Sequence, residues 1–195
     1  MRKALAIAAV AGLAGVASAQ SFTLHFNAAE TSVVTGQTIH WTVSVTGSFG
    51  AVDYLQAYDL NILAGQNDLG TASAFATAMS ALVNPTGGAV SGASINGVSG
   101  GQSSILGPTT AGPITLGSFT VVASASTGYL DYTVADGGIF ATTTGINIKP
   151  GSDFAPSTFD GIPGVASDRV GVNIPTPASA ALMGLGGLVA TRRRR

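Results

Sequence analysis

The sequence predicts an all-β protein with the architecture of a β-sandwich, and three observations lead to this prediction. Polar and apolar residues alternate in two clusters, residues 22–63 and 114–142, which places one face of each strand on a core and the other in water. β-Branched and aromatic residues dominate both clusters, as they do in strands generally. Turn-forming stretches separate the alternating segments, and several short strands joined by such turns are typical of a sandwich.

The first cluster predicts strands over residues 22–26, 39–45 and 54–62. Thr35-Gly36-Gln37 is expected to form the turn between the first two strands. Trp41 occupies an inward position of the second strand, which favours a place in the core over a place on a ligand-binding surface. The residues expected to face inward are Phe22, Leu24, Phe26, Ile39, Trp41, Val43, Val45, Tyr58, Leu60 and Ile62.

The second cluster predicts strands over residues 114–121, 130–134 and 139–142. The first of these alternates only if Gly117 forms a bulge, which is a common role for glycine within a strand. Asp136-Gly137-Gly138 is expected to form the turn before the last strand, because aspartate and glycine favour tight turns.

The segment between the clusters has a different pattern. Phe75, Met79 and Leu82 follow a spacing of i, i+4 and i+7 within the alanine-rich residues 71–83, which predicts one short helix that ends at Asn84-Pro85. An extended loop is the alternative for this segment.

Two further segments are rich in turn-forming residues. Residues 86–113 are expected to form a loop with a weak strand at residues 94–98. Residues 143–173 contain several proline and glycine residues and predict a partly ordered spacer.

The order of these elements over residues 22–142 resembles that of cohesin-like domains, which are jelly-roll sandwiches. This resemblance implies one β-sandwich domain over residues 20–142, although a fold alone does not decide function. The matching segments are the turn Val33-Val34-Thr35-Gly36, residues 39–45, the strand at Tyr58-Asp59 and residues 116–121.

The charges are few and unevenly distributed. Charged residues make up 9% of the chain, and its formal net charge is −1. Because six of the eight basic residues lie at the two ends, residues 20–174 carry only Lys149 and Arg169 against nine acidic residues, a net charge of −7. An acidic body excludes a nucleic-acid partner recognised through a basic surface. The absence of cysteine excludes disulfides and thiolate metal sites.

The N-terminus predicts a secretory signal peptide over residues 1–19. Arg2-Lys3 provides the positive start, residues 4–15 are apolar, and Ala17-Ser18-Ala19 is a small-residue cleavage site. Signal peptidase is therefore expected to cut between Ala19 and Gln20, so the mature chain would lie outside the cytoplasm.

The C-terminal residues 174–195 predict a membrane-targeting segment. Residues 178–190 are almost entirely apolar and precede a terminal arginine cluster. A helix of this length spans about 20 Å, so bilayer thinning or snorkelling arginines would have to help it to cross. The positive-inside rule places the arginines in the cytoplasm and the body outside. The terminal arginines are Arg192, Arg193, Arg194 and Arg195.

This tail resembles the sorting signal of bacterial PEP-CTERM proteins, which combines a Pro-Glu-Pro motif, a short apolar helix and an arginine cluster. Pro175, Thr176 and Pro177 stand at the position of the motif, and Thr176 replaces the glutamate of the family. The resemblance implies processing by an exosortase, a membrane-embedded cysteine transpeptidase. Thr176 in place of glutamate is expected to affect cleavage by the exosortase more than it affects membrane targeting.

The sequence contains no nucleophile elbow, no His-Glu-x-x-His zinc motif and no phosphate-binding loop. We therefore expect no catalytic residues and no enzyme activity.

His25 and His40 are the two histidines, and both occupy outward positions of expected strands. They are expected to be solvated surface residues, and a shared metal site is the alternative.

The acidic residues leave two alternatives open. Asp53 with Asp59, or Asp131 with Asp136, could form the carboxylate pair of a glycoside hydrolase. Roles at the surface and in turns are favoured, and Asp59 is expected to face water. No resident metal or cofactor is expected, and a calcium ion is the alternative. Its ligands would come from Asp131, Asp136, Asp153 and Asp160.

Together these patterns predict an exported, non-catalytic protein at the cell surface or in the extracellular matrix of a bacterium. Its role would be structural, adhesive or carbohydrate-binding, and exposed Tyr54 or Tyr129 would suit stacking on sugar rings. The expected partners are signal peptidase, an exosortase-type transpeptidase, the membrane, and a polysaccharide or another surface protein. A carbohydrate-active hydrolase on the same fold is the alternative.

Overall fold

A computed structural model of the protein describes residues 21–79, 85–102, 113–139 and 143–174. These residues form fifteen strands and one short 3-10 helix, which confirms the all-β prediction. The elements are β1 (Phe22–Ala28), β2 (Ser32–Val33), β3 (Thr38–Gly47), β4 (Asp53–Ala64), η1 (Asn67–Leu69), β5 (Gly70–Ala72), β6 (Ala76–Thr77), β7 (Thr86–Ser91), β8 (Ser94–Gly101), β9 (Ile114–Ala123), β10 (Gly128–Leu130), β11 (Tyr132–Asp136), β12 (Gly145–Pro150), β13 (Phe159–Gly161), β14 (Gly164–Ser167) and β15 (Val170–Val172).

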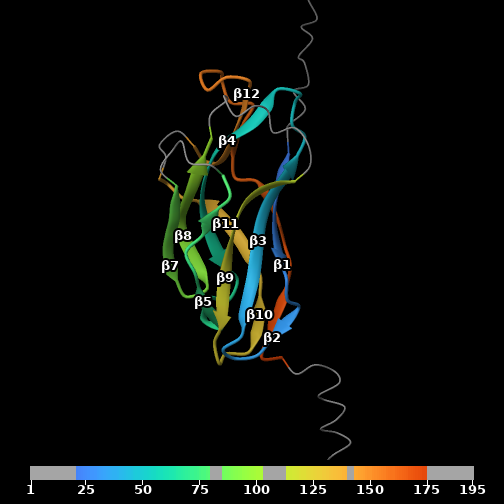
Figure 1. Ribbon diagram of the computed structural model, residues 1–195, viewed down its shortest axis with the longest axis vertical. Coiled ribbons are helices and arrows are strands. Elements are labelled where there is room, and N and C mark those ends of the chain that lie inside the picture. Colours follow the sequence, from blue (N-terminus) through green and yellow to red (C-terminus); the bar gives the residue numbers. More distant parts are fainter. Residues whose placement is uncertain (1–20, 80–84, 103–112, 140–142, 175–195) are drawn as a thin grey trace, which may run out of the picture.

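Two large sheets face each other across the core, and a small third sheet lies at one end (Figure 1). The first sheet has the order β14-β1-β3-β9-β5, with β6 also paired to β9. The second sheet has the order β13-β12-β4-β8-β7, with β11 also paired to β4. The third sheet has the order β10-β15-β2. The pairs β1–β14 and β2–β15 are parallel.

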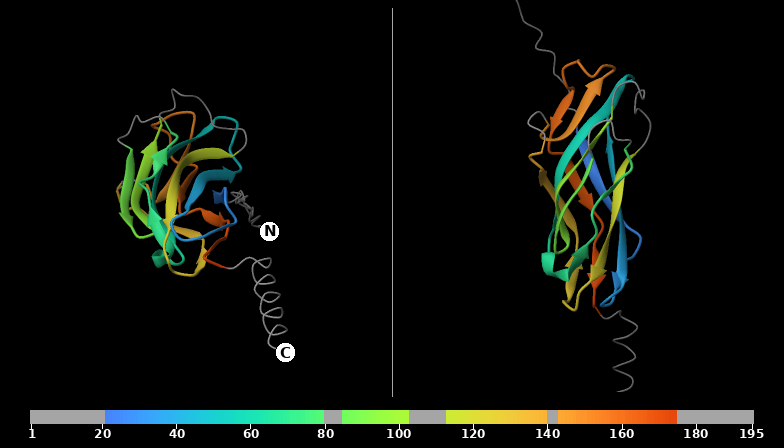
Figure 2. Two further views of the ribbon diagram at one scale, coloured as in Figure 1. Left: turned by 60° about the horizontal axis from the view of Figure 1, so that its bottom comes forward. Right: turned by 60° about the vertical axis from the view of Figure 1, so that its left-hand side comes forward.

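The two ends of the sandwich carry different parts of the chain (Figures 1 and 2). At one end, which we call the tip, the loop 151–156 after β12 lies beside residues 50–52 before β4. At the opposite end, which we call the base, the turns 34–36 and 124–126 surround the point where the described chain stops at Ile174.

Most of the strand predictions from the alternating patterns are confirmed. β1, β3, β4, β9, β10 and β11 contain expected strands, and β8 contains the weak strand expected at residues 94–98. The bulge expected at Gly117 is present, because the partner of β3 passes from Gly117 opposite Val43 to Thr115 opposite Ser44. Of the strand expected at residues 139–142, Ile139 lies outside any strand and the others lie outside the described residues.

The expected helix over residues 71–83 is wrong for residues 71–79, which form β5, β6 and the segment between them. The backbone of these residues forms hydrogen bonds with neighbouring strands. The Phe75 N–H donates to the Gly87 carbonyl, and the Ala78 N–H donates to the Leu116 carbonyl. Phe75 and Met79 are nevertheless buried in the core. Leu82 lies outside the described residues.

The expected spacer over residues 143–173 is also wrong, because this segment supplies β12, β13, β14 and β15. Ile146 and Ile148 of β12 point into the core, while the strand pairs with β4. The four strands join all three sheets, so this segment completes the sandwich.

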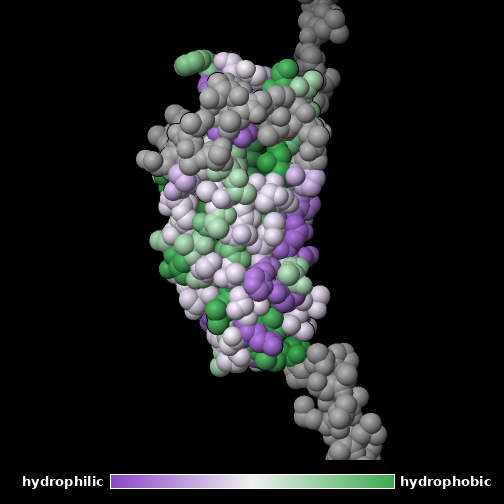
Figure 3. Space-filling model, viewed as in Figure 1, coloured by the Kyte–Doolittle hydropathy of each residue, from purple (hydrophilic) through white to green (hydrophobic). Residues whose placement is uncertain are grey.

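The outer face of the first sheet carries mainly hydroxyl-bearing side chains. Figure 3 looks onto β3 and β9, where the surface is mostly of intermediate hydropathy. His25 and His40 point outward on this face, as expected. The hydroxyl-bearing residues of its central strands are Thr23, Thr38, Thr42, Ser44, Thr46, Thr115, Ser118 and Thr120.

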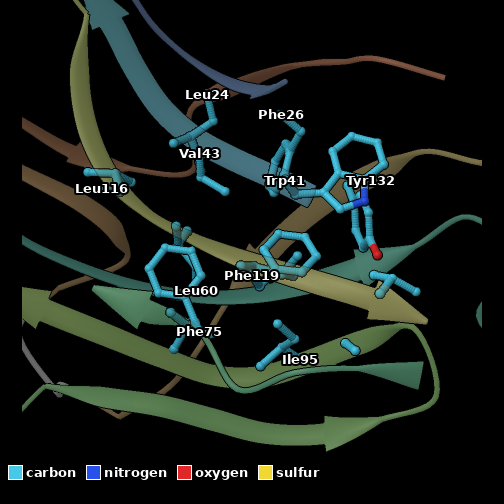
Figure 4. Packing of buried hydrophobic residues seen from close by; sticks show 14 of the residues in the cluster. Leu24, Phe26, Trp41, Val43, Leu60, Phe75, Ile95, Leu116, Phe119 and Tyr132 are labelled. Atoms are coloured by element: carbon cyan, nitrogen blue, oxygen red, sulfur yellow. The ribbon is translucent and has the colours of Figure 1, made fainter. Parts of the chain in front are cut away.

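An aromatic cluster fills the space between the large sheets (Figure 4). Trp41 stacks on Phe119 with ring centroids 6.2 Å apart, and Tyr132 meets these two rings edge-on at 4.9 and 5.1 Å. Phe26 stacks on Tyr132 at 5.5 Å. The Tyr132 hydroxyl donates to the Ala93 carbonyl at 3.0 Å. Burial raises the pKa of the Tyr132 hydroxyl far above its usual value, so this group stays neutral at physiological pH.

Because Gly117 has no side chain, the Phe75 ring occupies the space next to it. A Cβ at Gly117 would lie 2.4 Å from the Phe75 ring and 2.3 Å from the Ala76 carbonyl oxygen. Because β6 would have to move, we expect Gly117→Ala to lower the free energy of unfolding by about 1–3 kcal/mol, measured by urea denaturation. Gly164→Ala is the control, because its nearest neighbour lies 3.6 Å from the added Cβ. Equal losses in both variants would contradict this explanation.

Candidate functional site

The terminal residues predicted to carry export and sorting lie outside the described residues. Ala17, Ala19 and Gln20 precede the described chain, and the sorting residues follow it. Those sorting residues are Pro175, Thr176, Pro177, Arg192, Arg193, Arg194 and Arg195. Within the described residues, no helix has the length and apolar character needed to cross a membrane.

The two histidines do not form a shared site. His25 pairs with Ser44, which lies four positions after His40 along β3. The His25 Nε2 lies 2.8 Å from the Thr46 hydroxyl, and the His40 Nδ1 lies 2.8 Å from a carboxylate oxygen of Glu30. The backbone N–H of His40 also donates to Glu30, and this hydrogen bond lowers the pKa of the Glu30 carboxyl.

Asp53 and Asp59 lie on the same strand, and each carboxylate accepts a backbone N–H. Asp53 accepts from Gly50 at 2.8 Å, and Asp59 accepts from Ile139 at 2.6 Å. The expectation that Asp59 faces water is wrong, because its exposed fraction is 0%. The segment after β11 crosses the outer face of the second sheet at this point, and the Gly137 N–H donates to the Asp59 carbonyl.

Two further candidate carboxylates, those of Asp136 and Asp160, also accept N–H groups of the protein. Asp136 accepts the N–H of Gly138, which confirms the expected turn. Asp160 accepts the Thr144 N–H at 2.8 Å. No three His, Asp or Glu side chains gather as a potential metal site among the described residues, so the structure does not assemble the proposed calcium ligands.

The aromatic residues considered for sugar stacking do not form an exposed strip. Trp41 is buried, as expected, but Tyr54 is buried too, which is contrary to expectation. The Tyr54 hydroxyl donates to the Asp153 carboxylate at the tip. Tyr129 is partly exposed, and the Arg169 guanidinium lies 4.0 Å from the centre of its ring.

The most exposed large apolar side chain among the described residues lies at the tip. Phe154 is 99% exposed, and Val52 beside the same loop is 57% exposed. Figure 3 shows hydrophobic atoms projecting from this end of the molecule. An exposed phenylalanine forgoes about 1.5–3 kcal/mol of burial energy, which becomes available when a partner covers the ring.

Hydrogen bonds hold the loop that carries Phe154. The Lys149 ammonium donates to the Asp153 carbonyl at 2.6 Å, and the Ala155 N–H donates to the Ser152 carbonyl at 3.1 Å. The Gly151 N–H donates to the Val52 carbonyl at 2.9 Å, which joins the loop to the segment before β4. The ring is therefore presented from a backbone that is already ordered, so binding would cost little additional ordering.

Sequence reasoning misses Phe154 because the proline and glycine residues of 143–173 predict a spacer. A phenylalanine between Asp153 and Pro156, in a stretch of turn-forming residues, has no apolar neighbour in the sequence with which to share a face. That isolation was the available indication that its ring faces solvent.

No known protein family model matches the chain, and no curated protein matches it either. Solved structures do match. One is a type III cohesin module from the ScaE cell-surface anchoring scaffoldin of Ruminococcus flavefaciens, at 15% identity and a TM-score of 0.52, covering 84% of this chain and 94% of the module. Another is the second type II cohesin module from the ScaA scaffoldin of Acetivibrio cellulolyticus, at 12% identity and a TM-score of 0.52, covering 84% and 96%.

A third match is a type II cohesin in complex with an X-dockerin, also from Acetivibrio cellulolyticus. It has 11% identity and a TM-score of 0.51, and it covers 78% of this chain and all of that chain. These likenesses establish that the fold is a cohesin-like β-sandwich, as the order of sequence elements predicted.

Proposed function

We propose that this protein is an exported, non-catalytic interaction module that binds another surface protein through its tip. The observation behind this proposal is Phe154, whose ring is fully exposed on a hydrogen-bonded loop. Aromatic anchors at the centre of an interface typically contribute most of its binding energy. The tip is also the end of the sandwich farthest from Ile174, where the chain continues toward its C-terminal segment.

Export and tethering complete the proposal. The sequence before Gln20 has the order of a signal peptide, which signal peptidase would remove after Ala19. The apolar residues 178–190 and the arginines after them would hold the chain in the membrane. Pro175-Thr176-Pro177 would be the site at which an exosortase-type transpeptidase processes it. The body, which includes residues 143–173, would then face the outside of the cell.

A protein partner fits this site better than a polysaccharide. Among the described residues the tip offers one exposed ring, whereas the strip of aromatic rings expected for sugar stacking is not present among Trp41, Tyr54 and Tyr129. A similar solved structure is a cohesin bound to a dockerin-containing protein, which supports a protein partner for this fold. Carboxylates that bind backbone N–H groups, as Asp53 and Asp59 do, argue against the alternative of a hydrolase.

Cross-linking from the tip tests this function. The chain has no cysteine, so Val52→Cys labelled with a benzophenone gives a single photoreactive group beside Phe154. On cell envelopes of the source bacterium, we expect this label to form a covalent cross-link to a protein. Adding Phe154→Ala should weaken the interaction about 30-fold, which corresponds to about 2 kcal/mol. Val90→Ala is the matched control, because Val90 is an exposed apolar residue of β7, away from the tip.

The outcomes separate the candidate partners. Cross-linking to a protein that is lost with Phe154→Ala and kept with Val90→Ala supports the proposal. A protease-resistant, carbohydrate-containing product would favour a polysaccharide partner. Cross-linking that is unchanged by Phe154→Ala would exclude the ring as the anchor.

A further inference from the structure

The side chain of Asn173 forms hydrogen bonds that hold the last residues of the described chain against the base. Asn173 accepts hydrogen bonds from the backbone N–H and the hydroxyl of Thr35, at 2.6 and 3.0 Å. Its amide nitrogen donates to the carbonyls of Ser124 and Ser126, both at 2.8 Å. Its backbone N–H donates to Val33. Asn173 therefore connects both turns of the base to the point where the chain leaves the sandwich.

The backbone of Asn173 supports the same conclusion. Its φ is +52°, and it is the only described residue other than glycine with a positive φ. Asparagine is one of the few residues that adopt this conformation readily. The exit direction of the chain is thus set by a specific residue in a specific conformation.

Very little chain separates this exit from the apolar tail. Only residues 175–177 lie between Ile174 and the apolar residues 178–190. Four Cα–Cα steps reach at most about 14 Å, whatever their conformation. A lipid headgroup layer is about 5–8 Å thick. If the tail enters the hydrocarbon at residue 178, the base must lie within about 10 Å of the headgroups.

The surface around Ile174 carries residue types that suit a position next to lipid headgroups. Val34, next to the bonded Thr35, is 57% exposed, and Val122 is also exposed. Tyr129 pairs with Gly171 of β15 and carries the Arg169 guanidinium on its ring. Tyrosine and arginine are residue types that favour the boundary between membrane and water.

We propose that the short tether and Asn173 hold the base against a phospholipid headgroup surface, with the sandwich upright and the tip outward. This inference rests on the membrane tethering proposed above, and it applies to the chain before an exosortase-type transpeptidase processes it at residues 175–177. The body has a net charge of −7, so attraction to anionic lipids is not the cause of the contact. Because β3 alone is about 33 Å long, Phe154 would stand clear of the membrane and remain accessible to a partner.

Two matched labels test the orientation. Val34 at the base and Val52 at the tip are both 57% exposed, and the chain has no native cysteine. Val34→Cys and Val52→Cys, each in the chain from Gln20 through Arg195, are labelled with a fluorophore and reconstituted into phosphatidylcholine–phosphatidylglycerol vesicles. Headgroup spin-labelled lipid is the quencher. We expect quenching at residue 34 to be at least about 3-fold stronger, because the headgroup layer is thin relative to β3.

Vesicle flotation separates the two proposals. If the chain does not float with the vesicles, tethering fails, and the orientation fails with it. If the chain floats but both labels are quenched equally, tethering stands and the orientation is overturned. A flexible insertion of sixteen Gly and Ser residues after Ile174 should keep flotation and reduce quenching at residue 34 to the level at residue 52. Quenching that survives the insertion would overturn the short tether as its cause.

Discussion

Replacing Trp41 by alanine is expected to lower the free energy of unfolding by about 3–5 kcal/mol. Trp41 is almost completely buried and lies against Phe119 and Tyr132, so the truncation removes the centre of the aromatic cluster (Figure 4). A domain of this size typically has only about 5–15 kcal/mol of stability. The variant should therefore lose a large share of its stability. Urea denaturation followed by far-UV circular dichroism measures the loss, because Trp41 is the single tryptophan and its fluorescence disappears with it.

Trp41→Phe separates packing from polarity. The indole N–H has no hydrogen-bond partner among the described residues, although it is buried. Phenylalanine keeps one ring and removes that N–H, so we expect a loss of only about 1–2 kcal/mol. If Trp41→Phe cost as much as Trp41→Ala, the explanation by ring packing would be wrong.

The strands of the core could be predicted from sequence because burial on one face imposes a period of two. Phe22, Leu24 and Phe26 on β1 are buried, while Thr23 and His25 between them are not. The same rule located β3, β4 and β9, and it identified the bulge at Gly117 as the only way to keep β9 in register.

The misinterpreted helix shows where the rule is ambiguous. Phe75 and Met79 are four positions apart, and four is both one helical turn and two strand repeats. Which structure forms depends on the partners of the backbone. The carbonyl of Gly87 accepts from Phe75, and that contact joins residues far apart in the sequence.

The candidate site was harder to predict, because exposure depends on neighbours that a pattern does not describe. Alternation places Asp59 on the outer face of β4, but it does not reveal that the segment around Gly137 covers this face. Phe154 is the converse, an aromatic ring that no residue of the described chain covers. Both depend on how the chain after residue 136 crosses and completes the sandwich.

Removal of the Asp59 carboxylate is the second large effect that we expect. In Asp59→Ala, the Ile139 N–H loses its acceptor at 2.6 Å, an oxygen of a carboxylate whose exposed fraction is 0%. Loss of a hydrogen bond to a charged group should cost about 1.5–3 kcal/mol. Urea denaturation would report the global loss, and amide hydrogen exchange at Ile139 would report the local one. The matched control is Asp68→Ala, because Asp68 is an exposed carboxylate and such surface changes usually fall within about 0.5 kcal/mol.

The side-chain oxygen, more than the negative charge, should account for this effect. Asp59→Asn keeps one carbonyl oxygen that can accept from Ile139, so it should retain much of the protection of that amide against exchange. The space is tight as well, because a Cβ on Gly137 would lie 1.9 Å from an oxygen of Asp59. Gly137→Ala should therefore also expose the Ile139 amide to exchange, although it leaves the carboxylate in place. If Gly137→Ala left the protection of Ile139 intact, the contact between this segment and β4 would not be what buries Asp59.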